Sequence, residues 1–294
     1  MINEITKNKI TELQKQYAVL SEGNGHVLKE IAIAEIPEMV YNSNAIENST
    51  LTLEDTEKIL IGDDLQRKVN VREVFEAKNL ANITEILLEK NNCNLTIKQI
   101  LTLHKLLLTN IDNGIAGRFR SGKEWVRVGN HLGANPLFVS SLKQELVDNY
   151  NKDNERYFLD KIAYFHAEFE TIHPFCDGNG RMGRLLINLQ LMALDLPPII
   201  IHNKSKHKEY YPLFDKYPVN FKFDEFTELF AILLQEALHK RIALLAAKRV
   251  IPLSVWAERN GVKPNIAANK AKRQTIPAFR MREKWMIDEN YLVI

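Results

Sequence analysis

The chain has 294 residues, of which 45% are hydrophobic and 26% are charged. This length allows about two domains with ordinary hydrophobic cores, and the composition argues against a disordered, collagen-like or low-complexity protein. The net charge of +2 conceals an asymmetry, because residues 240–294 carry 12 Lys and Arg against four acidic residues, whereas the rest of the chain is net acidic. A basic end on an acidic body indicates two modules with different partners.

Cysteine usage and hydropathy predict the compartment. The only two cysteines, Cys93 and Cys176, cannot build a disulfide framework, and the first residues lack the apolar core of a secretion signal. No apolar run reaches the ~18 residues needed to cross a bilayer. The sequence therefore predicts a cytoplasmic protein with no membrane segment.

The spacing of apolar residues predicts a mainly α fold. Residues 118–129 differ, because they alternate in type around Trp125 and predict a short β-hairpin with its turn at Ser121 and Gly122. Helices are expected at residues 74–88, 97–108, 157–171, 180–195 and 223–247.

One segment between two apolar helices has the composition of an anion-binding loop. Residues 173–184 read His-Pro-Phe-Cys-Asp-Gly-Asn-Gly-Arg-Met-Gly-Arg and run directly into the next expected helix. Gly178 and Gly180 let the backbone approach a ligand with its N–H groups turned inward. The helix N-terminus adds a partial positive charge. The segment therefore predicts a cradle for phosphate.

The side chains around this loop suit several phosphates in series. Arg181 and Arg184 lie three residues apart on one helix face, so they can hold two phosphate groups. Asp177 offers a hard oxygen ligand for Mg²⁺, and Asn179 can bond a further phosphate oxygen. His173 has a side chain of near-neutral pKa that can take a proton from an incoming hydroxyl. From the residue alone, a histidine satisfied by a loop carbonyl is the alternative.

The loop resembles the signature of a known family. The Walker motif and the His-Glu-x-x-His zinc motif are both absent. Residues 173–184 instead match, without departure, the signature HPFx(D/E)GNGRxxR of Fic-domain proteins. The resemblance implies a mainly helical domain that uses ATP and Mg²⁺ to transfer AMP to a Ser, Thr or Tyr hydroxyl of a target protein.

The resemblance also implies a role for each position of the signature. His173 would be the general base, and Asp177 would hold Mg²⁺ against the α and β phosphates. Residues 199–208 depart from the family pattern, so the adenine pocket is left undefined. The residues expected to bind nucleotide are Phe175, Gly178, Asn179, Gly180, Arg181, Arg184 and Tyr211.

The expected hairpin at residues 118–129 resembles the flap of the same family. That flap pairs with extended backbone of a target protein, a form of strand addition that selects little on side chains. An ordinary surface hairpin is the alternative.

An upstream segment resembles the inhibitory motif (S/T)xxxE(G/N) of the same family. Ser43 and Glu47 occupy its fixed positions, and Asn48 follows. Glu47 would pair with Arg184 and remove the arginine that holds the γ phosphate. The resemblance therefore implies autoinhibition, and a helix-surface carboxylate is the alternative reading of Glu47.

The basic end resembles a winged helix-turn-helix module. Residues 253–258 and 264–272 would be its two helices, 260–262 the turn and 276–287 the wing. Such a module binds DNA phosphates with a salt-dependent affinity, or docks a protein. The basic residues offered to phosphate are Lys270, Lys272, Arg273, Arg280, Arg282 and Lys284.

These readings combine into one domain plan. Residues 1–110 form an N-terminal helical region with the inhibitory motif at 43–48, residues 111–250 the catalytic core, and residues 251–294 the winged-helix-like module. The predicted function is autoinhibited protein adenylylation, including self-modification. The open alternatives are another transfer or AMP removal from the same site, and a DNA-binding regulator that senses nucleotide. A homodimer is also left open.

Overall fold

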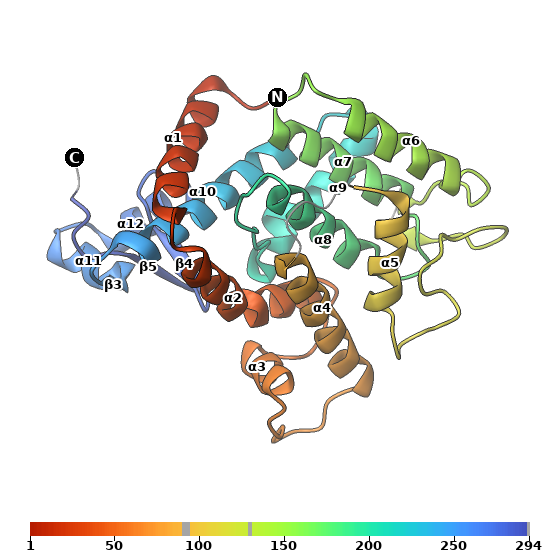
Figure 1. Ribbon diagram of the computed structural model, residues 1–294, viewed down its shortest axis with the longest axis horizontal. Coiled ribbons are helices and arrows are strands. Elements are labelled where there is room, and N and C mark those ends of the chain that lie inside the picture. Colours follow the sequence, from red (N-terminus) through yellow and green to blue (C-terminus); the bar gives the residue numbers. More distant parts are fainter. Residues whose placement is uncertain (90–94, 129–130, 293–294) are drawn as a thin grey trace. The chain divides into compact units, whose positions relative to one another are not determined.

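A computed structural model describes residues 1–89, 95–128 and 131–292. It confirms a mainly helical fold with small antiparallel strand pairs (Figure 1). The chain divides into two compact units, one made of Met1, Glu35–Asp195 and Ile200–Thr227, and the other of Ile2–Ala34, Leu196–Ile199 and Glu228–Ile294. Among the described residues, no helix is both long and apolar enough to cross a bilayer. The predicted domain boundaries near residues 110 and 250 stay predictions.

The expected helices are present in the first unit, with ends that differ from expectation by a few residues. Two helices share their residues between the units, α2 (Gly25–Ile46) and α10 (Asp224–Ala246). The remaining helices of the first unit are α3 (Leu53–Ile61), α4 (Val71–Glu89), α5 (Ile97–Leu107), α6 (Val139–Lys152), α7 (Phe158–Ile172), α8 (Asn179–Met192), the short turns η1 (Asn203–Ser205) and η2 (Lys206–Tyr210), and α9 (Tyr211–Asn220).

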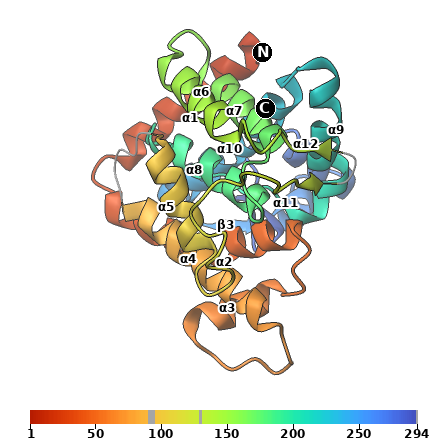
Figure 2. The ribbon, with the colours of Figure 1, turned by 90° about the vertical axis from the view of Figure 1, so that its right-hand side faces the viewer.

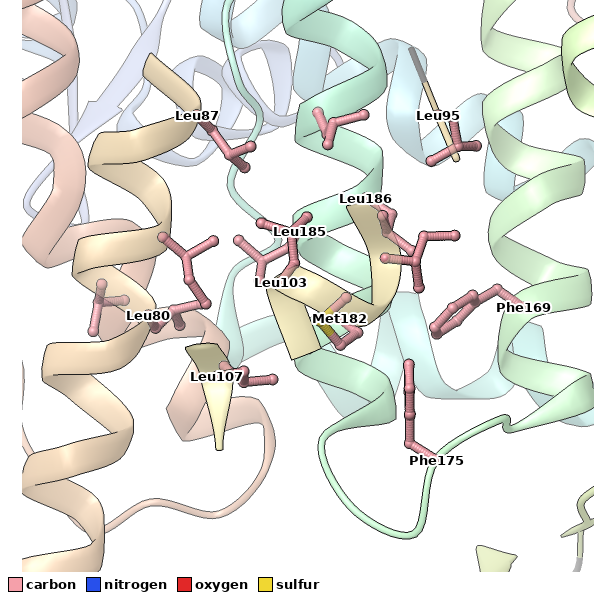
Figure 3. Packing of buried hydrophobic residues seen from close by; sticks show 14 of the residues in the cluster. Leu80, Leu87, Leu95, Leu103, Leu107, Phe169, Phe175, Met182, Leu185 and Leu186 are labelled. Atoms are coloured by element: carbon pink, nitrogen blue, oxygen red, sulfur yellow. The ribbon is translucent and has the colours of Figure 1, made fainter. Parts of the chain in front are cut away.

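Helix α8 is the central helix of the first unit. Every residue from Arg181 to Leu191 is buried, as expected of a helix enclosed on all sides. It packs against α7 and α4 (Figures 1 and 2). Its Met182 and Leu185 meet Leu103 of α5 and Phe169 of α7 in one hydrophobic cluster (Figure 3). Burial of apolar surface, at ~25 cal/mol per Å², lets this cluster stabilise the unit. The N-terminus of α8 is therefore held on a rigid base.

The hairpin exists, but its predicted turn was wrong. Strand β1 (Arg127–Val128) pairs antiparallel with β2 (His131–Leu132), so Ser121 and Gly122 do not join the two paired strands. Gly129, the last residue of the predicted hairpin, lies outside the described residues.

The side chain of Glu124 explains this difference. Its carboxylate accepts two bonds from the Arg118 guanidinium, at 2.7 and 2.8 Å, and a third from the Ser121 N–H at 2.7 Å. These bonds close residues 118–124 into a compact loop. The same residues therefore cannot run as the first strand of a hairpin.

The second unit contains α1 (Glu4–Ser21) and a small mixed module. Strand β3 (Val250–Pro252) leads into helices α11 (Leu253–Arg259) and α12 (Pro264–Lys272), followed by β4 (Phe279–Met281) and β5 (Lys284–Asp288). The sheet order is β3-β5-β4, with antiparallel pairs. Trp256 is buried in its core and donates to the Tyr291 carbonyl at 2.9 Å. The two helices and the paired strands lie where the sequence predicts them, and the winged-helix assignment itself stays a prediction.

Candidate active site

The side chain of Asn179 holds the loop between α7 and α8 in shape. Asn179 accepts from the Phe175 N–H and donates to the Phe175 carbonyl, both at 2.8 Å. Its side chain is buried, so it shapes the loop, and the expected contact between Asn179 and a phosphate oxygen stays a prediction. Gly178, with φ of 79°, makes the turn that starts α8.

Phe175 packs beneath the loop, and its expected contact with a nucleotide stays a prediction. Its ring is fully buried and stacks on His104 at a centroid distance of 3.6 Å. The side chain therefore belongs to the core beneath the loop, and only the backbone of Phe175 remains available to a nucleotide.

His104, to which no role was assigned from the sequence, supports the loop from below. Its Nδ1 accepts from the Gly117 N–H at 3.0 Å, so its Nε2 carries the hydrogen and donates to the Asp177 carbonyl at 3.0 Å. Burial lowers the pKa of His104 to about 4, which keeps the ring neutral at pH 7. The contact with Asp177 joins residues 73 positions apart in the chain, which no local sequence pattern reveals.

His173 is placed by the end of α7 and by a buried arginine. It caps α7 with φ of 50°, a conformation that costs a non-glycine residue about 1–3 kcal/mol. The Arg120 guanidinium stabilises it by donating to the carbonyls of His173, at 2.6 Å, and of Ile172, at 2.9 Å. Arg120 is only 1% exposed. Its contacts tie the loop before the hairpin to the backbone of His173.

The protonation of His173 suits a base. Burial lowers its pKa to about 4, so the ring is neutral at pH 7. Its Nδ1 lies 3.3 Å from the Glu170 carbonyl, an acceptor, which assigns the hydrogen to Nδ1 and leaves the Nε2 lone pair free. Burial also raises the pKa of Glu170 to about 8, so the carboxyl group of this neighbour carries no charge at pH 7 that would draw a second proton onto the ring.

A cavity of about 980 Å³ lies over the loop. It is lined by the expected site residues His173, Asp177, Gly178, Asn179, Gly180, Arg181, Arg184, Tyr211 and Glu47, and Ser43 and Phe175 are not among its lining. Val128 of β1 and the preceding Val126 reach it, as do Arg72 in the first turn of α4 and Lys68 in the loop before that helix.

Two of the lining residues, Arg72 and Glu76, have no counterpart in the sequence expectations. Arg72 donates to one Asp177 oxygen, and Arg181 lies 3.3 Å from the other. Glu76 lies 2.9 Å from Arg181 and 3.0 Å from Arg72. The i, i+4 spacing of Arg72 and Glu76 on one helix is a usable signal, but it does not indicate which residues they meet.

The expected pair between Glu47 and Arg184 is present. The Arg184 guanidinium donates to the Glu47 carboxylate at 2.8 Å, to the Ser43 hydroxyl at 3.0 Å and to the Ser43 carbonyl at 2.8 Å. A Cβ at Gly180 would lie 2.2 Å from the Glu47 carboxylate, so glycine is needed there for the close approach. Glu47 therefore reaches the N-terminal turn of α8, where an anion is favoured.

The end of α2 that carries Glu47 is held by a clamp that the sequence did not indicate. The Lys206 ammonium donates to the carbonyls of Ala45 and Ile46, at 2.9 and 3.0 Å, and to the Asn48 side chain at 3.1 Å. The Tyr211 hydroxyl donates to the Ile46 carbonyl as well. A cation on the last carbonyls of a helix satisfies them and stabilises the helix end.

Replacing Lys206 with Met is expected to weaken the hold of Glu47 on Arg184. One lost set of hydrogen bonds costs about 0.5–1.5 kcal/mol, so any reaction that Glu47 inhibits should accelerate about two- to tenfold. Lys208→Met, at an exposed position of the same turn, is the matched control. Rates of nucleotide transfer measured for both variants check this, and an unchanged rate for Lys206→Met would show that the clamp does not position Glu47.

Comparisons with known proteins agree with this geometry. A family model described as Fic/DOC family matches residues 94–191. Protein adenylyltransferase Fic of Drosophila willistoni is 29% identical over 222 residues, which are 72% of this chain and 43% of that protein. Protein adenylyltransferase fic-1 of Caenorhabditis elegans is 33% identical over 178 residues, 58% of this chain and 34% of that protein. The chain thus spans less than half the length of these curated relatives.

Solved structures show the same fold. A Fic-domain-containing signalling protein from Bacteroides thetaiotaomicron has a TM-score of 0.72 at 25% identity, over 81% of this chain and 96% of that one. A Fic family protein from Desulfovibrio desulfuricans, at 20% identity, has a TM-score of 0.68 over 100% of this chain and 98% of its own. Residues 94–191 thus match the Fic/DOC family model, and the chain shares its fold with these solved structures.

Proposed function

We propose that this chain is a protein adenylyltransferase, which transfers AMP from ATP to a hydroxyl of a target protein and of itself. The observation that carries the proposal is the neutral His173 in the same cavity as the N-terminal turn of α8 and the two arginines, Arg181 and Arg184. A base, an anion site and cations in one cavity are the parts that nucleotidyl transfer requires.

The reaction follows from these positions. Nε2 of His173 takes the proton of the incoming hydroxyl, whose oxygen forms a bond to the α phosphorus. The bond between that phosphorus and the bridging oxygen breaks, and pyrophosphate leaves with the electron pair. The N–H group of Gly180 in the first turn of α8, with Arg181, holds the phosphates in line and neutralises their charge.

Asp177 is the residue that would hold Mg²⁺. No group of three or more His, Cys, Asp or Glu side chains suited to a metal occurs in the described part of the chain. One carboxylate in a cavity, already paired with a cationic guanidinium, fits an ion that takes its other ligands from water and phosphate. When bound, the ion would neutralise charge between the α and β phosphates.

Glu47 would inhibit the reaction by occupying Arg184. With Arg184 bonded to Glu47 and Ser43, the guanidinium is not free for a third phosphate. ATP would then bind with its phosphates displaced from the line of attack. Tyr211, close to the same segment, would border the nucleotide.

The hairpin β1–β2 is the proposed site for the target protein. Trp125, Val128 and Leu132 are about half exposed along it. Exposed backbone and apolar side chains at the cavity edge suit an extended peptide that adds as a strand. Such binding leaves the choice of Ser, Thr or Tyr to the geometry at His173. A cytoplasmic location and a homodimer stay predictions.

ATP labelled at either the α or the γ phosphate tests the reaction type. Adenylylation places only the α label on protein, whereas phosphate transfer places only the γ label. AMP removal, with Glu47 positioning the water, would instead release label from pre-modified protein. Incorporation of the γ label alone would overturn the proposal.

A second function, DNA binding, is favoured by the charge of the small module. Residues 259–282 contain seven Lys and Arg and no acidic residue. Helix α12 exposes Asn265, Asn269 and Lys272 at i, i+4 and i+7, one polar helix face. Of the basic residues first offered to phosphate, Arg280 is already paired with Glu236 at 2.6 and 2.8 Å.

Lys272→Gln is therefore expected to weaken binding to duplex DNA and to reduce its dependence on salt by about one phosphate contact, a change of ~0.9 in the log–log slope. Titrations by fluorescence anisotropy at several salt concentrations measure this. His173→Ala is the control: it removes the proposed base of AMP transfer, which has no part in DNA binding, and should leave duplex affinity unchanged. A protein-docking module would show no salt-dependent affinity for any duplex.

A further inference from the structure

We propose that Arg72 competes with the divalent cation for Asp177, so that metal binding requires Arg72 to leave this carboxylate. The inference deepens the proposed function, because Asp177 is its candidate metal ligand. It implies that a residue of α4 lowers the affinity of the site for the metal ion.

Both oxygens of Asp177 are already in use. Oδ1 accepts from the Gly178 N–H at 2.6 Å and lies 3.3 Å from Arg181 Nη2, and Oδ2 accepts from Arg72. The guanidinium of Arg72 is thus the cation bound to Oδ2, the oxygen that does not accept from the loop backbone. A metal ion that uses Oδ2 must displace it, since the two cations cannot occupy the same position.

Arg72 is the member of this group that can move. Its side chain is 50% exposed, whereas that of Arg181 is 4% exposed and cannot leave without uncovering a buried charge. Arg72 lies in the first turn of α4, and its second partner, Glu76 at 3.0 Å, is on the same helix. Rotation of the Arg72 side chain therefore frees Asp177 without moving the backbone or the signature loop.

The arrangement also keeps the buried charged side chains paired when metal replaces Arg72 at Asp177. In the described structure, two arginines and two carboxylates alternate around the group: Arg72, Asp177, Arg181 and Glu76. When metal takes Asp177, Arg72 keeps Glu76 as a partner and can turn its free donors to phosphate. The competition therefore costs the loss of one charge-assisted bond and leaves no buried charge unpaired.

Mn²⁺ binding to the complex of the full chain with ADP tests this competition. ADP carries the two phosphates that flank the proposed metal position and has no third phosphate to compete with Glu47. Water-proton relaxation reports the protein-bound Mn²⁺, and no turnover is needed. Arg72→Gln is expected to tighten Mn²⁺ binding about tenfold, because metal no longer displaces a charge-assisted bond.

A matched control separates competition from a general charge effect. Lys68→Gln removes one positive charge from the same cavity wall, at a residue that forms no ion pair with Asp177 in the described structure, and should change Mn²⁺ affinity less than twofold. Added to Asp177→Asn, Arg72→Gln should give no gain. Equal gains in Arg72→Gln and Lys68→Gln, or unchanged or weaker Mn²⁺ binding in folded Arg72→Gln, overturn the inference.

Failure of this inference and failure of the proposed function are distinguishable. Mn²⁺ affinity is measured without catalysis, so tighter binding in Arg72→Gln would stand even if no AMP were ever transferred. Conversely, AMP transfer with unchanged Mn²⁺ affinity in Arg72→Gln would retain the function and remove the competition.

Discussion

Glu47→Gly is expected to raise the rate of AMP transfer, including self-modification, by about ten- to a hundredfold with ATP and Mg²⁺ saturating. The substitution removes the carboxylate that accepts from Arg184 at 2.8 Å. A charge-assisted hydrogen bond of this kind contributes about 1.5–3 kcal/mol, and each 1.36 kcal/mol is a factor of ten in rate. The freed arginine can then hold the terminal phosphate in the productive pose. Initial rates with labelled ATP measure the effect.

The position of Glu47 makes this substitution informative. It follows the last residue of α2, so glycine there does not interrupt a helix. Glu54→Gly, which removes an exposed carboxylate from the first turn of α3, is the control and should leave the rate unchanged. Equal rates for the Glu47→Gly and parent chains would reject the inhibitory role of Glu47.

His173→Ala in the Glu47→Gly background is expected to lower AMP transfer by about 10²–10⁴-fold, the usual loss when a general base is removed. Nucleotide affinity should change little, because the phosphate contacts of the proposal come from the loop backbone and the arginines. A rate loss with retained ATP binding, measured by calorimetry, is the expected combination. A loss of both would indicate that the loop has collapsed.

The pH profile supplies a second readout for the same residue. The neutral ring is the active form of the base, and burial holds its pKa at about 4. Activity should therefore persist as the pH falls through the ordinary histidine range near 6.5 and decline only toward pH 4. Loss of half the rate near pH 6.5 would show that the working base is a solvated group.

The sequence predicted those parts of the fold that depend on local patterns. The apolar spacing located α4, α5, α7, α8 and α10, because a buried helix face repeats every three to four residues. The hairpin turn was misplaced because Ser121 and Gly122 do form a turn, and only the Arg118 and Glu124 side chains show that it closes a loop.

The sequence predicted the anion-binding loop of the candidate site, but not the residues from other helices that hold this loop and Glu47 in place. The Gly178 turn and the Glu47–Arg184 pair follow from two motifs. Arg72 meets Asp177 across 105 residues, and Lys206 meets Ile46 across 160. Such contacts depend on how helices pack, which one sequence does not reveal. Phe175 shows that a residue of the signature need not face the site, because its ring is buried in the core beneath the loop.

Intact-mass spectrometry of the Glu47→Gly chain, incubated with ATP and Mg²⁺ and followed by peptide mapping, tests the central claim most directly. The account predicts covalently added AMP on a Ser, Thr or Tyr hydroxyl, and no adduct when His173 is also replaced by Ala. An added phosphate without the nucleoside, or unmodified protein that nonetheless binds ATP, would contradict the proposal that this cavity transfers AMP.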